Sequence, residues 1–441
     1  MRRQGGAEYE TQYIAFLSCW FYAFQVVLPS QPPFPMFPLS PYTVYLIMSA
    51  GFMFCFNTVV TVNQVYLVNI AELNPLQLVL LGTVLETSIF IFEIPTGVVA
   101  DVYSRRLSVI IGMVLIGVGF ILEGSVPLFT WIVCAQILWG VGYTFTSGAS
   151  EAWIADELGE KRAGQAYLRG AQAGQVGALL GIGVSVALAS IHVQIAVIGG
   201  GICFVILGMF LILTMSEKGF QTVSKGDQES WPALFHTFKV GVALIRRKPM
   251  LISIMIISLF YGMFSEGFDR LWTPYLLTSF TFPETLDLHP VMWFGIINAV
   301  GLVLAIIAIE IVNRRIDTNN HRTVVVALAV VHLLTMAGIL VFARTDQFSI
   351  ALAVLWTMIM VRRMYGPLLA VWINPQLAAP VRATVLSIRG QMDSFGQMGG
   401  GPILGAIATL RTIPYALIVS VVFLIPALGL YVRSFFSNHK S

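Results

Sequence analysis

The chain has 441 residues, of which 57% are hydrophobic and only 11% charged, and its mean hydropathy is +0.82. A soluble domain carries charges on about a quarter of its residues, so this composition excludes a soluble protein and indicates a polytopic membrane protein. The net charge of +3 does not indicate a nucleic-acid partner, because the lysines and arginines cluster in particular loops.

The first 42 residues do not match the rest of the chain. Residues 13–29 are apolar but short for a membrane span, and five prolines follow between Pro32 and Pro41. A signal peptide is not indicated, because acidic residues accompany the early arginines and no small-residue cleavage site follows. We expect residues 1–42 to be an N-terminal extension with a misassigned start, so that Met36 opens the protein just before the first span. The alternative is an extra span, which would place the N-terminus outside.

Twelve later stretches are long and apolar enough to cross a bilayer, which needs roughly 20 apolar residues. They lie near 43–68, 77–96, 107–123, 128–150, 165–190, 193–215, 251–279, 291–312, 323–342, 348–372, 383–408 and 412–432. One set of loops holds most of the basic residues, while the opposite set holds only Arg344 and Arg411. The positive-inside rule therefore predicts that both ends of the twelve-span body are cytoplasmic, in a plasma-membrane protein.

The chain is predicted to form two halves, 43–216 and 251–434, with a cytoplasmic tail at 435–441. The linker between them, 217–250, contains Trp231 to Lys248, where apolar residues recur at helical spacing beside a basic end. We predict an amphipathic helix on the membrane surface there; the alternative is an ordinary basic linker.

An internal repeat supports this division. Trp-Ile, Arg-Ala, Arg-Gly and Gly-Gln-x-Gly patches follow one another in the first half and again, in the same order, about half the chain later. Both copies enter a glycine-rich span from a cytoplasmic loop. Equal orientation in both halves predicts a parallel repeat of six plus six helices, related by an axis along the membrane normal. The first copy begins at Trp153, Arg162, Arg169 and Gly174, and the second at Trp372, Arg382, Arg389 and Gly396.

The loop between the second and third spans carries Gly97, Asp101, Arg105 and Arg106, in a Gly-x-x-x-Asp-x-x-x-Arg-Arg run. This run, with twelve spans and a parallel repeat, resembles the major facilitator superfamily of secondary transporters. The resemblance covers roughly 43–434. It implies that Asp101 faces the positive N-terminal end of span 11 and helps to hold the two halves together when the cavity opens outward. The alternative is a basic loop that only sets the topology.

Acids on neighbouring loops are the expected partners of these arginines. Glu151 and Asp156 follow span 4, and Glu310, Arg314 and Arg315 repeat the acid-to-arginine spacing after span 8 without a matching glycine. The chain departs from the family pattern, because Val102 and Ser104 stand where the family has Arg and Gly. The Gly-rich spans 5 and 11 are predicted to pack closely, and a gating role is the alternative.

Charges inside spans are costly and usually face a cavity or a partner. As proton-coupling residues we predict Glu86, Glu93, Asp269 and Asp393. By resemblance, spans 1, 4, 7 and 10 line a central cavity, and the candidates for contact with substrate are Glu266, Arg270, Arg362, Arg363 and Gln391. The alternative at each position is a structural pair: Glu266 with Arg270 at spacing four, and Asp393 with Arg362 or Arg363.

We therefore expect an all-α transporter of a small molecule that works by alternating access, driven by protons, and exports amphipathic compounds. Pro95-Thr96-Gly97 and Arg382-Ala383-Thr384 give a looser resemblance to bacterial drug or macrolide efflux permeases. Import of an organic anion held by Arg362 or Arg363 is one alternative, and a membrane sensor on a transporter-like scaffold is another.

No enzyme, cofactor, metal site or nucleic-acid partner is expected, and a monomer is usual in the family. The four cysteines have no paired spacing. The chain has no phosphate-binding Gly-x-x-x-x-Gly-Lys-Ser/Thr loop, so it carries no ATPase of its own.

Overall fold

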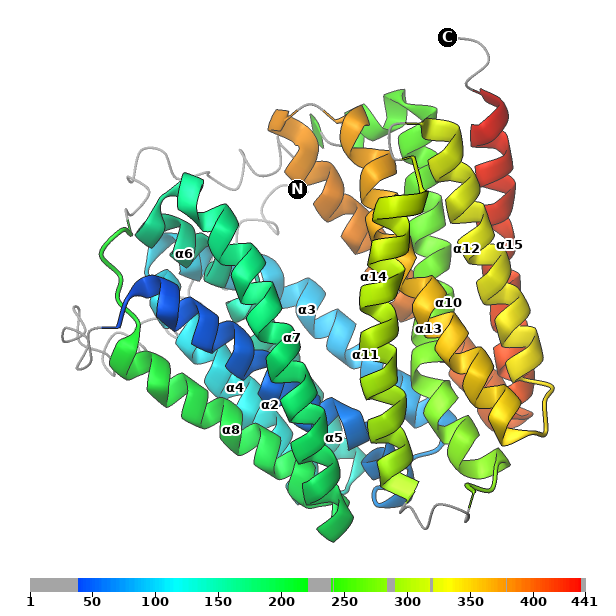
Figure 1. The fold of residues 1–441 in the computed structure, drawn as a ribbon, viewed down its shortest axis with the longest axis horizontal. Coiled ribbons are helices and arrows are strands. Elements are labelled where there is room, and N and C mark those ends of the chain that lie inside the picture. The colour runs from blue at the N-terminus through cyan, green and yellow to red at the C-terminus, as the bar shows by residue number, and fades with distance from the viewer. Residues whose placement is uncertain are drawn as a thin grey trace, which may run out of the picture.

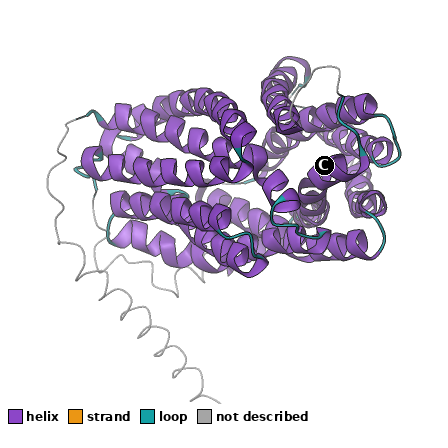
Figure 2. Cartoon of the chain, turned by 90° about the horizontal axis from the view of Figure 1, so that it is seen from below, coloured by secondary structure: helices purple, strands orange, loops and turns teal. Residues whose placement is uncertain are grey.

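The computed structural model describes residues 39–220, 239–240, 242–283, 290–317, 320–377 and 379–437, and this part of the chain is helix and loop without a strand (Figure 2). The predictions for residues 1–38, and for most of the linker at 221–238, fall outside it. The helices of the first half are α2 (Pro41–Asn69), α3 (Pro75–Val102), α4 (Arg105–Ser125), α5 (Phe129–Thr146), α6 (Ala149–Leu158), α7 (Glu160–Ile191) and α8 (Val193–Thr214). The helices of the second half are α10 (Pro249–Ser279), α11 (Pro290–Arg315), α12 (His321–Phe342), α13 (Phe348–Ile373), α14 (Ala379–Leu410) and α15 (Ile413–Ser437), with the short 3-10 turn η2 (Asn374–Gln376) after α13.

Several helices begin where the sequence supplies a cap. Ser40 and Asn74 precede the prolines that open α2 and α3, and each side chain accepts a hydrogen bond from a backbone N–H of the first turn. Proline suits this position because its missing N–H would have no partner there. Ser104 caps α4 in the same way, through the backbone N–H of Leu107. The cap of α4 therefore lies in the loop between α3 and α4. This loop and its flanking residues Gly97, Asp101, Arg105 and Arg106 are called the charged loop below.

Eleven of the described helices are long and apolar enough to cross a membrane. The twelfth long helix, α14, occupies the predicted eleventh span. Its glycines, Gln391, Asp393 and Gln397 lower its hydropathy below that of its neighbours. The predicted all-α membrane architecture is confirmed.

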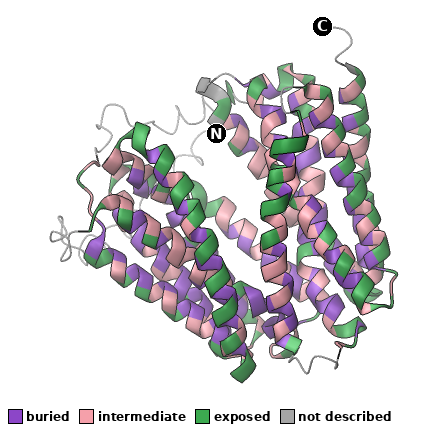
Figure 3. Ribbon diagram, in the orientation of Figure 1, coloured by how far each residue is buried: buried purple, intermediate pink, exposed green. Residues whose placement is uncertain are grey.

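Large apolar side chains cover the outside of the helix bundle. On α8, Ile202, Ile206 and Met209 are exposed, whereas Phe204 and Leu207 are buried against the first-half core. Figure 3 shows the same alternation along most helices, with exposed residues on the outer faces and buried ones between helices. A surface of this kind would be unusual for a protein in water and matches a lipid-facing belt.

The packing repeats from one half to the other. In the first half α2 packs against α7 and α8, α4 against α5 and α8, and α3 against α5. In the second half α10 packs against α14 and α15, α12 against α13 and α15, and α11 against α13. Each second-half pair is the counterpart of a first-half pair six spans earlier. The contacts between halves repeat as well, because α3 meets α14 and α10 while α11 meets α7 and α2.

Glycines make the closest helix contacts possible. A Cβ atom on Gly177 of α7 would overlap the backbone carbonyl of Ala50 on α2, and one on Gly396 of α14 would overlap that of Leu259 on α10. Helices in lipid gain little from hydrophobic association, so they depend on such close packing. In these two pairs the glycines have the close-packing role.

The two halves lie side by side and diverge toward the end at which the C-terminus lies (Figure 1). Contacts between them that involve α3 and α14 extend from Leu76, whose backbone N–H donates to Thr409 at 3.0 Å, to Phe90, whose ring centroid lies 5.0 Å from that of Phe395. Beyond Phe90, the side chains at positions 91–94 of α3 are exposed or half-buried. The halves therefore touch near one membrane surface and separate toward the charged loop.

We predict that Gly177→Ala lowers the free energy of unfolding by about 1–3 kcal/mol, because the added methyl group overpacks a backbone contact. The control is Gly183→Ala on the same helix, where a Cβ would meet no atom within 4 Å. That substitution is expected to be neutral or slightly stabilising, since alanine is the better helix former. Thermal unfolding of purified protein in detergent measures both, and equal midpoints for the two variants would contradict the packing argument.

Candidate functional site

The charged loop forms a network at one end of the first half. Arg105 pairs with Asp156 at the end of α6 and donates to the carbonyl of Ala152 at 3.0 Å. A weaker contact, 3.6 Å, joins Arg105 to Asp101. Glu151 is exposed and lies outside this ion-pair network. Of the two acids expected to pair with Arg105 or Arg106, Asp156 therefore pairs with Arg105, and Glu151 does not take part.

The sequence analysis missed Glu217, which follows α8. Its carboxylate accepts hydrogen bonds from the Ser104 hydroxyl at 2.5 Å and from the backbone N–H of Arg106 at 2.9 Å. The carboxylate thus lies at the positive N-terminal end of α4, where a negative charge is stabilised. The side chain of Arg106 is buried and donates to the carbonyl of Ile212 at 2.6 Å. The loop is thereby held to the ends of α6 and α8 within one half.

Asp101 is expected to meet the N-terminal end of α14 only when the cavity opens outward, so that contact stays a prediction. Its side chain is 61% exposed, and its ion-pair partner is Arg105. One turn earlier, a Cβ atom added at Gly97 would have no neighbour within 4 Å. The two halves are separated at this end, so the exposed face of α3 has no partner helix from the second half there, whereas Val99 and Ala100 stay buried against the first half.

The second-half copy of the loop is simpler. Glu310 and Arg314 pair within α11, and both side chains are largely exposed. Arg315 is exposed beside them. Because this pair joins residues of one helix, it ties no helices together, unlike the pair of Arg105 with Asp156.

A second group of charges lies between the halves, near the end at which they touch. Glu266 and Arg270 of α10 form an ion pair at 3.0 Å, and both are mostly buried. The pair rests against Gly82 of α3, where a Cβ atom would overlap the carboxylate. A Cβ on Gly401 of α14 would also contact Glu266. Two glycines from two helices therefore make the socket that accepts this pair.

Glu86 lies one turn farther along α3 and bridges the halves. The hydroxyl of Ser394 on α14 donates to its carboxylate at 2.8 Å. Thr87, next to it, contacts the sulfur of Met398 at 3.2 Å. Glu93, seven residues after Glu86, is exposed on the separated part of α3. The two predicted proton-coupling residues of α3 thus lie in different surroundings, one in the contact and one beyond it.

Among the charges of α10, α13 and α14, two form an ion pair that the sequence analysis did not consider. Arg362 makes a bidentate ion pair with Asp269, at 2.6 and 2.8 Å, and its guanidinium lies over the rings of Phe264 and Phe268. Asp393 instead accepts a hydrogen bond from Gln397 at 3.0 Å. The alternative in which Asp393 forms a structural pair with Arg362 or Arg363 is therefore not the arrangement in this structure. The relative rotation of three helices decides this, and spacing along one helix cannot reveal it.

The two adjacent arginines have different environments, as their angular separation on a helix predicts. Arg362 points into the second half, whereas Arg363 is exposed. Behind Arg362, the rings of Tyr261 and Tyr365 stack with centroids 4.0 Å apart, and His332 packs against both. His332 is buried, and its Nδ1 lies 3.0 Å from the backbone carbonyl oxygen of Leu328. Gln391 is half-buried on α14.

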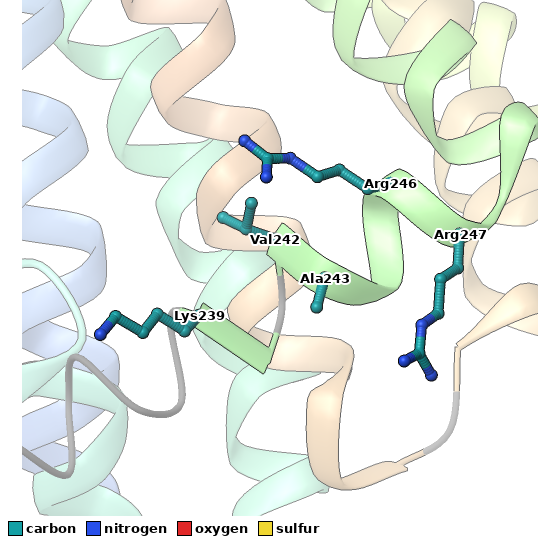
Figure 4. A pocket seen from close by; sticks show the side chains of 5 residues that line it. All are labelled: Lys239, Val242, Ala243, Arg246 and Arg247. Carbon is teal, nitrogen blue, oxygen red and sulfur yellow. The ribbon is translucent and has the colours of Figure 1, made fainter.

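The described part of the linker forms a shallow hollow. Lys239, Val242, Ala243, Arg246 and Arg247 line a space of about 480 Å³ (Figure 4). Figure 4 shows the three basic side chains pointing in different directions, so they do not converge on one ligand. Residues 239–240 and 242–247 are helical, and Ile245 packs on the second-half core. This hollow lies apart from the charges between the halves.

The comparisons with known proteins decide the family. The sequence model of the Major Facilitator Superfamily matches residues 43–374. The chain belongs to the major facilitator superfamily. It is 22% identical over 357 residues to YxaM of Bacillus subtilis (strain 168), described as an uncharacterised MFS-type transporter, in an alignment covering 81% of this chain and 86% of that protein.

Solved structures of superfamily transporters share the fold. A bacterial homologue of the human lysosomal transporter Spinster, in an inward-facing and occupied conformation, has a TM-score of 0.70 at 13% identity over 90% of this chain and 97% of that one. The nucleoside transporter NupG has a TM-score of 0.70 at 16% identity over 91% and 100%. The peptide transporter POT in complex with sulfate has a TM-score of 0.68 at 13% identity over 89% and 94%. Superfamily membership makes this chain a multi-pass membrane transporter of a small molecule and not an enzyme.

We predict that Gly82→Val separates the halves at the end where they now touch, because the side chain would occupy the space of the Glu266 carboxylate. Spin labels at Ala71 and Leu410, near the ends of α2 and α14, should report longer and broader distances in the variant. Gly366→Val is the control, since a Cβ at Gly366 meets no atom within 4 Å. Identical distance distributions in wild type and Gly82→Val would show that the socket does not hold the halves together.

Proposed function

We propose that this superfamily member works by alternating access and exports small amphipathic compounds in exchange for protons. The observation that carries the proposal is the bridge between Glu86 and Ser394, a titratable carboxyl group in the contact between the two halves. Protonation of such a group changes its hydrogen bonding, and hence the contact, so proton binding and conformation can be linked. Asp269 and Asp393 are the further candidates for the same role.

The conformation fits one step of that cycle. From the distribution of basic residues we place the charged loop in the cytoplasm, and we propose that the membrane is the plasma membrane. The halves are then closed on the outside and separated on the inside, as in the inward-facing Spinster homologue that shares the fold. In the opposite state Asp101 and Gly97 would approach α14, which is the contact that the family resemblance implies. We propose a monomer as the working unit.

Uptake of a small organic anion is a second candidate function, since the human organic anion transporter MFSD10 shares the fold, with a TM-score of 0.56. Arg362 is the residue on which it would depend. Both arms of its guanidinium fork already donate to Asp269, so an anion would have to displace a carboxylate. This competition favours the export proposal.

Export is tested by dye and antibiotic accumulation in an efflux-deficient host. Wild type should lower accumulation, and a protonophore should abolish the effect. Asp393→Asn should abolish it too, because the amide cannot exchange a proton. If all proteins reach the membrane and none alters accumulation across a broad panel, multidrug export is refuted and anion uptake becomes the function to test.

Asp101→Asn is predicted to separate function from stability. In the present conformation Asp101 makes only an exposed contact, so its loss should change the free energy of unfolding by no more than about 0.5 kcal/mol. Transport should nevertheless fall, because the outward-facing state would lose the interaction with the start of α14. A thermal melt beside the accumulation assay checks both parts, and normal transport by this variant would count against the gate role.

The pair of Arg362 with Asp269 is predicted to be required for folding or transport as a unit. Asp269→Asn leaves a mostly buried guanidinium without its counter-charge, and we expect the free energy of unfolding to fall by about 1–3 kcal/mol, because the Asp269 carboxylate is itself half exposed. Arg363→Gln, one residue from Arg362 but exposed, should behave as wild type. Thermal unfolding in detergent measures the difference, and a melt of Asp269→Asn that matches Arg363→Gln would contradict the pairing argument.

A further inference from the structure

A buried acid that neither the charged loop nor the contact between halves uses lies in the first half. Glu123 is in the last turn of α4, and only 1% of it is exposed. Its Oε2 accepts a hydrogen bond from the Nε2 of Gln136 on α5 at 3.0 Å. Its other oxygen, Oε1, is buried and has no hydrogen-bond partner. Half of the carboxyl group is thus unsatisfied in a dry setting.

Asn63 of α2 faces the same carboxyl group. Its side chain interacts with Glu123, yet its Oδ1 is buried and also has no partner. Tyr66, one turn along α2, is not free to help, because its hydroxyl donates to the backbone carbonyl of Glu123 at 2.6 Å. Oε1 of Glu123 and Oδ1 of Asn63 are thus both buried acceptors without a donor. Buried polar atoms are nearly always hydrogen-bonded, so this lack of a donor requires an explanation.

The carboxyl group of Glu123 also lacks a counter-charge. Among the described residues, no lysine, arginine or histidine forms an ion pair with Glu123. The side chains that surround it from α2 and α5 are neutral amides and a tyrosine. The charged group of the other half that acts on it is Arg270, which is already paired with Glu266. An ionised carboxylate buried without a counter-charge is very costly, and such groups become neutral instead.

We propose that Glu123 is a proton-binding site, with the proton on Oε1 and donated to Oδ1 of Asn63. A neutral carboxylic acid has one O–H donor and keeps its acceptor oxygen. The single proton therefore satisfies both orphan oxygens, while Gln136 continues to donate to Oε2. It also removes the unpaired charge. One bound proton thus allows Asn63, Glu123 and Gln136, from three helices, to lie together without an unpaired charge.

Glu123 lies near the end of the molecule at which the two halves touch, so its proton could respond to the movement of the halves. It is near the end of α4 opposite the charged loop, and Arg270 acts on it from the second half in this conformation, in which the halves touch at that end. Separation of the halves there would remove a positive charge from its surroundings. That this proton takes part in coupling rests on the proposed function; that Glu123 carries a proton does not.

Infrared spectroscopy of the full-length protein in lipid bilayers at neutral pH tests the site directly, because a protonated carboxyl group has a C=O stretching band that an ionised one lacks. The Glu123→Gln variant should lose part of this band. Glu310→Gln, at an exposed ion pair, should leave it unchanged. An unaltered band in folded Glu123→Gln would overturn the proposal.

Two further measurements test the position of the proton. Glu123→Gln should melt close to wild type, because the amide N–H₂ replaces the O–H donor toward Asn63. Asn63→Leu should retain the band but shift it to higher frequency, since the acid O–H loses its acceptor. A band in Asn63→Leu at the wild-type frequency would refute the donation to Asn63.

Transport assays then separate the two claims. If Glu123→Gln loses the band and also loses protonophore-sensitive export, the proton belongs to the coupling path. If it loses the band but exports normally, the coupling role is overturned and a structural proton site remains. If wild type shows no proton-driven export at all, the proposed function fails, while the infrared result still decides whether Glu123 holds a proton.

Discussion

The arrangement of this protein depends on one constraint, that a charge in a low-dielectric interior needs a partner. Arg362 is held by Asp269 across two helices, and Glu266 is held by Arg270 within one. These ion pairs neutralise buried charges, and they also affect how the helices pack. The first fixes the rotation of α13 against α10, and the second presents a compact polar group to the glycine socket on α3 and α14. The orientation of the second-half helices thus depends partly on the need of their buried charged side chains to reach a partner.

The features that the sequence predicts well are those that depend on composition along the chain. Apolar runs mark the spans, and the repeated patches near Trp153 and Trp372 mark the two halves. The pairing of Glu266 with Arg270 follows from spacing on one helix. The partner of Arg362 could not be predicted in this way, because Asp269 and Asp393 are both acids on adjacent helices, and only their rotation distinguishes them.

Two other residues, Glu217 and Glu123, were not predicted from the sequence, for different reasons. Glu217 looks like an ordinary charge after a span, and its role at the start of α4 appears only when the ends of α4 and α8 are brought together. Glu123 lies in the final turn of an apolar run, where an acid resembles a helix-end residue exposed to water. Its signal was present as a pattern, namely Asn63, Glu123 and Gln136 as polar residues within three apolar spans. The contact implied for Asp101 belongs to the state that opens outward, and it stays a prediction because a structure describes one conformation.

The network around the charged loop also bears on how the chain is made. Arg105, Asp156, Ser104 and Glu217 all lie in the first half or directly after it, and they tie α4, α6 and α8 together without any residue of the second half. During synthesis, these contacts become available before α10 has left the ribosome. The first half can therefore settle as a unit in the membrane and serve as the surface on which α14 and α10 later assemble. In the second half the corresponding pair of Glu310 with Arg314 lies within one helix, so assembly of that half relies on other contacts, namely the pair of Arg362 with Asp269 and the glycine packing of α14 against α10.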